Sequence, residues 1–165
     1  MQYLYVADSR NHRIQKFDIN GNFVKSFGIE GNQSGQFNLP TTVIVDSHGD
    51  LYVNERGNER IQKLDTEGNP ILMWGSKGSG SSEFCHIEHL GIDKFDNIYV
   101  TDPQSDPGCS HQAAVKKFDR NGKFITQWQV PGEGSDPEHL ALDSQGNVYV
   151  SDRGTDEILV YKPVE

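Results

Sequence analysis

Cysteine and histidine side chains come in close pairs at two places in the middle of this chain of 165 residues. Cys85 is followed directly by His86, and Cys109 is followed two residues later by His111. Thiolate and imidazole groups are ligands that zinc prefers, but no Cys-x-x-Cys pair is present. Three alternatives stay open: a metal site with Zn or Ca, a disulfide between Cys85 and Cys109, or two unrelated free thiols.

Two further histidines occupy equivalent places in a repeated pattern. His89 and His139 each stand four residues before an aspartate, where an earlier copy of the pattern has Thr42. If the fold brings these imidazoles together, they could bind a metal or a polar ligand. The alternative is that both rings only pack between repeats.

Three arginines each closely follow an acidic residue. We expect each to form a local ion pair with that acid, a contact that contributes little at a surface. They are also candidates for contacting a partner, because they lie in predicted loops. The three pairs are Arg10 with Asp8, Arg56 with Glu55 and Arg153 with Asp152.

The elements that carry these residues recur along the chain. Copies of a Leu-Tyr-Val-x-acid pattern begin at residues 4, 51, 98 and 148, so the steps are 47, 47 and 50 residues. Each repeat also contains three other short segments rich in β-branched and aromatic residues, which is typical of strands. Four strands in a period of this length indicate a β-propeller blade. The other segments cover 13–18, 60–65, 114–119 and 157–161, then 23–28, 70–75 and 124–128, and finally 43–46, 90–93 and 140–143.

Most of the predicted tight turns share an Asp-x-x-Gly form, as in Asp46–Gly49, and one copy has Asp96 in place of glycine. The aspartate can accept turn N–H groups, and glycine tolerates the positive φ that the bend needs. If the four strands of a blade are named A to D, these turns join A to B and C to D. They therefore share one face, the turn face. The B–C and D–A loops lie on the opposite loop face, where binding is expected.

The sequence resembles the NHL-repeat β-propeller family in residues 35–40, 45–53, 60–64, 137–143 and 148–152. The resemblance implies an all-β fold of four-stranded antiparallel NHL blades, about three and a half in a single domain over residues 1–165. The expected units are a partial blade 1–28, blades 29–75 and 76–129, and a partial blade 130–165. The chain is then a fragment of a longer propeller, a subunit that self-associates to complete a ring, or an open arc with exposed edges.

A more distant similarity is to peptidyl-α-hydroxyglycine amidating lyases. It rests on Thr101-Asp102, His111-Gln112 and residues 115–119. The resemblance implies zinc held by channel histidines. This chain departs from the pattern by an insertion before His111, and Glu88 rather than His89 occupies the place of a channel histidine.

The composition narrows the possible partners. With 15 Lys and Arg against 24 Asp and Glu, the net charge of -9 disfavours a nucleic acid. No apolar run is long enough to span a membrane, and the N-terminus has no signal-peptide pattern, so the sequence predicts no compartment.

The leading prediction is a scaffold, not an enzyme, that binds a protein, peptide or glycan through its loop face. The alternative is a metal-dependent lyase or hydrolase. The candidate contact residues are Arg10, Arg56, His89, His111, His139 and Arg153, and the candidate metal ligands are His89, His139, Cys85, His86, Cys109 and His111.

Overall fold

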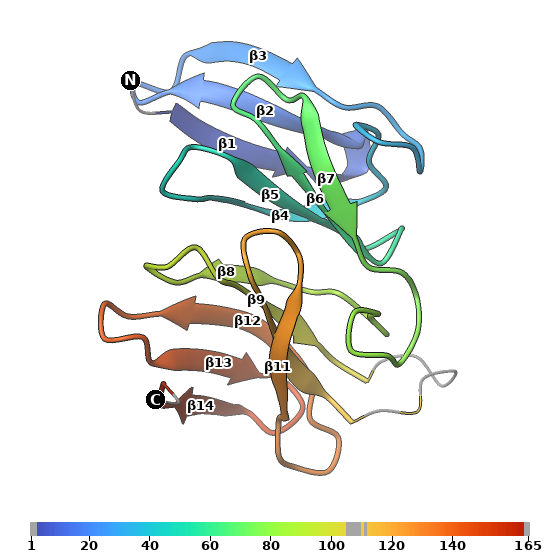
Figure 1. Ribbon diagram of the computed structural model, residues 1–165, viewed down its shortest axis with the longest axis vertical. Coiled ribbons are helices and arrows are strands. Elements are labelled where there is room, and N and C mark those ends of the chain that lie inside the picture. The colour runs from blue at the N-terminus through green and yellow to red at the C-terminus, as the bar shows by residue number, and fades with distance from the viewer. Residues whose placement is uncertain (1–2, 105–109, 111, 164–165) are drawn as a thin grey trace.

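The computed structural model describes residues 3–104, 110 and 112–163. Within them, fourteen strands form four antiparallel sheets, two of four strands and two of three, beside one short 3-10 helix, η1 (Ser9–Asn11). The sheets follow one another as the blades of an open arc, with both termini on the same side (Figure 1). The predicted all-β propeller of about three and a half blades is confirmed.

Each blade is a meander in which neighbouring strands in the sequence pair with one another. Blade 1 contains β1 (Tyr3–Asp8), β2 (Arg13–Asp18) and β3 (Phe23–Phe27), and blade 2 contains β4 (Pro40–Val45), β5 (Leu51–Glu55), β6 (Arg60–Leu64) and β7 (Pro70–Trp74). Blade 3 contains β8 (Leu90–Ile92), β9 (Ile98–Asp102), β10 (Ala114–Phe118) and β11 (Phe124–Gln129), and blade 4 contains β12 (Pro137–Leu142), β13 (Val148–Asp152) and β14 (Glu157–Tyr161).

The tight turns have the predicted chemistry. The Asp46 carboxylate accepts the N–H groups of His48 and Asp50, both at 2.9 Å, and Gly49 has a φ of 91°. Asp96 replaces the glycine and adopts a φ of 63°, a conformation that aspartate tolerates better than most residues. The carboxylate therefore fixes each turn, and the register of the flanking strands follows from it.

The hydrophobic core lies between blades. Alternate residues of the second and third strands of a blade face its neighbour, because side chains on a strand alternate between its two faces. The junction of blades 1 and 2 buries Ile14, Phe37, Leu51, Val53 and Leu64. The junction of blades 2 and 3 buries Tyr52, Ile61, Phe84, Ile87, Leu90, Ile98, Val100 and Phe118, and that of blades 3 and 4 buries Tyr99, Ala113, Val115, Val130, Leu140, Val148 and Val150.

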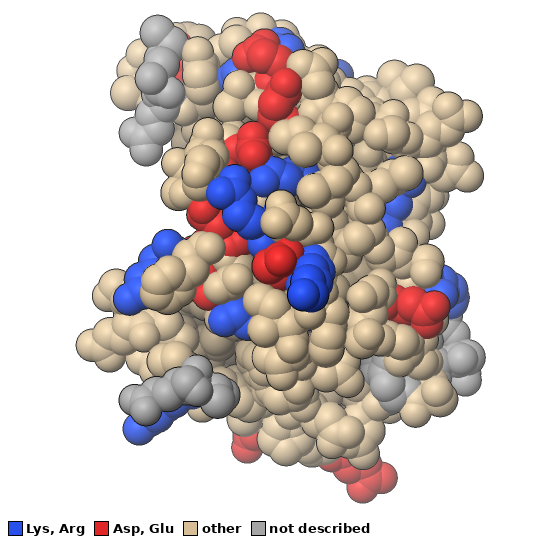
Figure 2. Space-filling model, in the orientation of Figure 1, with Lys and Arg blue, Asp and Glu red and all other residues tan. Residues whose placement is uncertain are grey.

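Ion pairs and hydrogen bonds also tie neighbouring blades together. Lys16 Nζ of blade 1 donates to the carbonyl of Thr66 in blade 2 at 2.8 Å. On the visible face of the molecule, acidic and basic atoms are mixed in a band across the upper and middle blades (Figure 2). The exposed ion pairs in this band contribute little to stability. None of the described segments forms a helix with the length and apolar character of a bilayer span.

Candidate functional site

The first strands of blades 2, 3 and 4 line the inner side of the arc. β4 contacts β8, and β8 contacts β12, which brings the loop-face ends of these strands together. A cavity of about 420 Å³ opens there, which we call the rim cavity. It is lined by Tyr5, Val6, Ala7, Thr41, Thr42, Val43, Glu88, His89 and His139.

His89 and His139 face each other in this cavity. Their ring centroids are 4.9 Å apart and the ring planes meet at 50°. The backbone N–H of His89 donates to the Thr101 hydroxyl at 3.0 Å, and that of His139 donates to the Ser151 hydroxyl at 3.2 Å. These anchors on the neighbouring strand hold both histidines in the same register, so the two rings meet as neighbours around the arc.

Both burial and proximity disfavour a charge on His89. Loss of hydration and, to a smaller extent, the neighbouring His139 together lower the pKa of its imidazole to about 4, although Glu88 opposes this shift. At neutral pH the ring is therefore neutral. A neutral imidazole offers one donor and one acceptor, which suits it to hydrogen-bond a polar ligand.

Glu88 supplies a carboxylate beside the two rings. His86 Nε2 lies 2.8 Å from one carboxylate oxygen, and Arg56 lies 3.3 Å from the same oxygen. Burial by itself would raise the pKa of Glu88, but the contacts with His86 and Arg56 outweigh burial and hold the pKa below its ordinary value. Glu88 is therefore ionised at neutral pH.

Glu59 lies behind this carboxylate, on the other side of His86. Its side chain is 12% exposed, and one oxygen lies 3.8 Å from His86 Nδ1. The other oxygen accepts the N–H of Ile87 at 2.9 Å. Burial raises the pKa of Glu59 to about 7, although the Ile87 hydrogen bond and His86 oppose this shift. His86 thus stands between a carboxylate that is charged and one that titrates near neutrality.

Sequence reasoning missed Glu59 and considered Glu88 only as a departure from another family's pattern. Neither residue belongs to a recognisable motif, and the blade 2–blade 3 contact that joins them is not visible in the sequence. One local sign is structural: Glu59 has a φ of 49°, in the left-handed region that glutamate rarely adopts. Glu59 directly precedes β6, and the residues that directly precede β2 and β14, His12 and Asp156, are also left-handed.

The expected ion pairs of the three arginines were wrong in their partners. Arg56 pairs with Glu88 of the next blade, and Arg153 reaches back to Asp136 at 2.5 Å and Glu138 at 2.6 Å. Arg10 is exposed in η1 and makes no ion pair among the described residues.

The acids that precede these arginines bind other groups. Each acid is the last residue of a strand, and the next strand or a nearby loop supplies its partner. Asp8 pairs with Arg13 at 2.8 Å, and Glu55 pairs with Arg60 at 2.6 Å. Asp152 accepts the N–H groups of Asp136 and Gly154 instead.

The cysteine–histidine pairs are only partly placed. Cys85 is 1% exposed and belongs to a disulfide, so it has no thiolate to offer a metal in this state. Cys109 and His111 lie outside the described residues, and the pairing of Cys85 with Cys109 stays a prediction. His86 lies between Glu59 and Glu88, as described above.

The metal ligands that the amidating-lyase resemblance implies are incomplete at the rim. A catalytic zinc site takes three protein ligands. His89 and His139 supply two, and among the described residues no third histidine, cysteine or carboxylate forms a compact ligand group with them. The pair therefore does not fit a three-ligand zinc centre within that part of the chain.

A compact group of possible ligands does occur on the turn face, where Asp46, His48 and Asp96 have ligand atoms within 4.8 Å of one another. These oxygens already receive donors. Asp96 accepts the N–H and hydroxyl of Ser47, at 2.9 and 2.7 Å, and Asp46 lies 3.3 Å from Lys63 Nζ. Because Lys63 already occupies the position of a cation, the group does not form a metal site. Its hydrogen bonds link blade 2 to blade 3, and we call this link a latch.

Solved structures with the same fold include two lyases and the propeller domain of Swd1. A structure titled streptogramin B lyase matches 98% of this chain at 18% identity with a TM-score of 0.68, covering 51% of that protein. Virginiamycin B lyase from Staphylococcus aureus matches 97% at 14% identity with a TM-score of 0.70, covering 52% of that protein. The β-propeller domain of Swd1 from Myceliophteria thermophila matches 98% at 14% identity with a TM-score of 0.62, covering 50% of that domain.

These likenesses show the fold. The chain spans about half the length of the solved structures it matches. One family model, described as strictosidine synthase-like, N-terminal, matches residues 125–154, from β11 to β13. The chain is therefore similar over one short stretch to a second propeller group, and its architecture is that of a β-propeller.

Proposed function

We propose that this propeller binds a protein, peptide or glycan partner through its loop face, with the rim cavity as the anchor. The observation that carries the proposal is the meeting of Thr42, Glu88, His89 and His139, from three blades, around one cavity. We also propose that the blades are of the NHL type, on the sequence resemblance given above.

The charges at the rim favour a polar ligand. Arg56 and Arg153 each face a carboxylate, Glu88 and Asp136 respectively, so neither cation acts alone. The imidazole of His89 is neutral and Glu88 is negative. The strands hold these groups in place before binding, which reduces the entropy lost when a ligand is ordered.

A selection from a displayed random peptide library tests this proposal, with a glycan array run in parallel. Binders are selected on the full chain and counter-selected on a Glu88→Gln/His139→Ala variant. We expect selected ligands to bind that variant at least tenfold more weakly, and to bind a turn-face control variant, His48→Ala, unchanged. Ligands that bind all three proteins equally, or no ligand from either collection, would contradict the proposal.

A second candidate is a lyase or hydrolase, favoured by the row of Glu59, His86 and Glu88. A group that titrates near pH 7 beside an ionised carboxylate is the arrangement that general acid–base catalysis uses. The row reaches the rim cavity through Glu88. Two of the solved neighbours are named as lyases, and a form of the staphylococcal enzyme with a histidine replaced by alanine is described as catalytically inactive.

Elemental analysis of untagged protein, followed by an assay of peptidyl-α-hydroxyglycine cleavage, separates the two candidates. Stoichiometric zinc or calcium that is lost in a His89→Ala/His139→Ala variant would favour the metal-dependent enzyme. Cleavage that is lost in Glu88→Gln would favour catalysis at the same rim. Absence of both metal and cleavage would leave the binding function.

A further inference from the structure

The loop that joins one blade to the next differs at the third junction. Twelve residues separate Phe27 from Pro40, and twelve separate Trp74 from Ile87, but only eight separate Trp128 from Pro137. The two longer loops each insert a phenylalanine into the core. The shorter loop, which includes residues 130–136, contains no aromatic residue.

The inserted phenylalanines close the first two junctions. Phe37 and Phe84 are both fully buried, and the Phe84 ring lies 5.8 Å from the ring of Phe118. The ring of Phe84 lies over Gly75, where a built Cβ would approach it to 2.6 Å. Glycine at that position therefore makes room for the phenylalanine.

The third junction lacks both halves of this arrangement. Tyr161 stands where Phe118 stands in blade 3, and its ring still meets Trp128 at 5.4 Å. Gln129 replaces the glycine, and no loop ring reaches Tyr161 among the described residues. The Tyr161 hydroxyl oxygen is buried and makes no hydrogen bond within that part of the chain.

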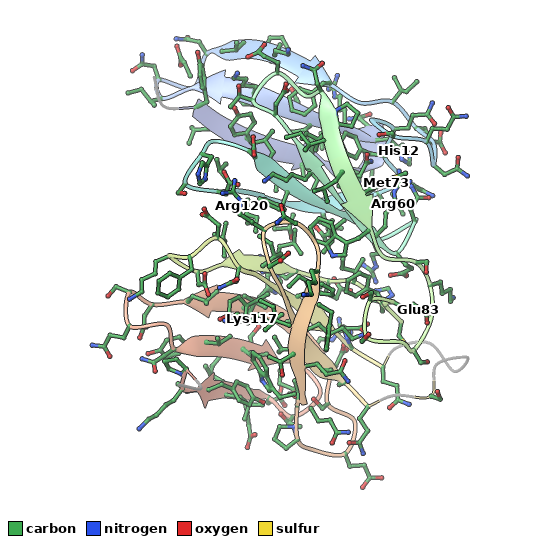
Figure 3. The ribbon with its side chains drawn as sticks, in the orientation of Figure 1. His12, Arg60, Met73, Glu83, Lys117 and Arg120 are labelled. Atoms are coloured by element: carbon green, nitrogen blue, oxygen red, sulfur yellow. The ribbon has the colours of Figure 1, made fainter. Side chains whose placement is uncertain are left out.

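The third junction also lacks the polar clamp of the other two loops. Arg60 donates to the carbonyls of Gln33 and Gln36, both at 3.0 Å, and Figure 3 shows its side chain beside Met73. In blade 3 the Lys116 ammonium donates to the carbonyls of Gly80 and Glu83. The positions of these clamps in blade 4 hold Glu157 and Leu159, neither of which is a cation.

A cavity of about 970 Å³ opens at this junction, between blades 3 and 4 on the loop face. Its loop wall is held by Asp152, which accepts the N–H of Asp136 at 2.8 Å and the hydroxyl of Ser135. The wall is thus built before any ligand arrives. The cavity lies apart from the rim cavity, since no residue lines both.

The lining combines uncharged polar groups and a few apolar ones with three charged side chains, Glu133, Asp136 and Arg153. Gln129 and Ser135 offer an amide and a hydroxyl, and Val130 and the Tyr161 ring give apolar contact. Arg153 also lines the cavity, but Asp136 and Glu138 neutralise it. No unpaired cation faces the cavity among the described residues, so it offers nothing to a phosphate or sulfate group.

We propose that the cavity between blades 3 and 4 binds a neutral oligosaccharide. Amide and hydroxyl groups both donate and accept, and carboxylates accept, as a dense set of sugar hydroxyls requires. The Tyr161 ring offers an apolar face to a pyranose ring. A phosphorylated or sulfated sugar is the less suitable occupant, because the carboxylates of Glu133 and Asp136 line the cavity beside Arg153 and no unpaired cation faces it among the described residues.

Calorimetric titration of the full chain with neutral tetrasaccharides of glucose and of N-acetylglucosamine tests the proposal. We expect at least one of them to bind, and Gln129→Trp, which places a bulky ring in the cavity, to weaken it at least tenfold. Tyr161→Phe removes only the buried hydroxyl, which a ligand in the cavity does not reach, and should leave both the fold and the binding unchanged. Val24→Trp, an exposed site on β3, is the matched control and should have no effect.

The rim variant Glu88→Gln separates this site from the proposed rim function, because it should leave sugar binding unchanged. Binding that Glu88→Gln abolishes and Gln129→Trp spares would overturn the proposal and place the sugar at the rim. Titration of a neutral tetrapeptide under the same conditions gives the remaining comparison. Binding of the peptide alone, or of neither probe, would also overturn it.

Discussion

At the scale of single residues, the protonation state of Glu59 depends directly on the burial and the contacts of its side chain. We expect the Glu59 carboxyl to titrate near pH 7, because burial disfavours its charged form. Glu88, two contacts away through His86, should titrate below the ordinary glutamate range. Carbon-detected NMR titration of the glutamate carboxyls measures both. A Glu59 midpoint near 4.5 would show that the side chain is hydrated and would contradict the account.

The same proton links Glu59 to stability. Its pKa is raised from 4.5 in the unfolded chain to about 7 in the folded one, so the folded state binds more protons between these values. The contribution of Glu59 to stability is therefore present below pH 4.5 and is lost as the pH rises through 7. Urea unfolding at several pH values should show this loss in the wild type and a flatter profile in Glu59→Gln. Identical profiles would contradict the prediction.

The pKa of His89 should be shifted downward, whereas that of Glu59 is shifted upward. Burial and the adjacent His139 lower its pKa to about 4, so we expect its ring to stay neutral at pH 5, where an exposed histidine is charged. Replacing His139 by Gln removes the neighbouring imidazole but not the burial. The pKa of His89 should then rise while staying below 6.5, as proton NMR of the imidazole signals can show. No change in His139→Gln would mean that the rings do not interact.

Among the elements, the A–B turn of blade 3 offers a test of how blades are joined. Asp96 accepts two hydrogen bonds from Ser47 of blade 2, so Asp96→Gly removes a link between blades although it relieves a left-handed aspartate. We expect a net destabilisation of about 1–2 kcal/mol, the cost of losing these bonds being larger than the strain relieved. Asp96→Asn should lose less. Greater stability of Asp96→Gly in urea unfolding would show that strain outweighs the link.

The clamp on the loop between blades 2 and 3 should matter more. Lys116 is 1% exposed and lies 2.8 Å from the Asp102 carboxylate, which is fully buried. Lys116→Met removes the cation from a buried carboxylate, and we expect a loss of about 3–5 kcal/mol in the free energy of unfolding. The neighbouring Lys117, which lies 3.5 Å from Asp93 and is more exposed, is the control. Lys117→Met should cost about 1 kcal/mol or less, and equal losses would contradict the distinction.

These elements show what the sequence could predict. The Asp-x-x-Gly turns and the alternation of strand residues are local, so the strands, their order and the two faces followed from residue types and spacing. The contact of Glu59 with His86, and of Arg56 with Glu88, joins loops of different blades. Such contacts depend on the angle between blades, which no local pattern encodes. The partners predicted for the arginines were wrong because their actual partners also lie on other segments of the chain, as Glu88 and Asp136 do.

At the scale of the whole molecule, the two faces of the propeller differ in how their loops are built. The turn face is closed by aspartate-capped turns and by latches such as Asp96 with Ser47. The loop face carries two cavities, one at the rim and one between blades 3 and 4. The turns fix the blades and leave the loops to vary, and it is on the loop face that we propose binding.

Hydrogen exchange of the complex with a selected ligand tests this division most directly. We predict protection of the backbone at 41–42, 88–89 and 138–139 when the ligand binds, with the turns at 46–49 and 93–96 unchanged. That pattern would place the ligand at the rim of the loop face. Protection confined to the turns, or lost from the loops, would contradict the claim that the loop face binds.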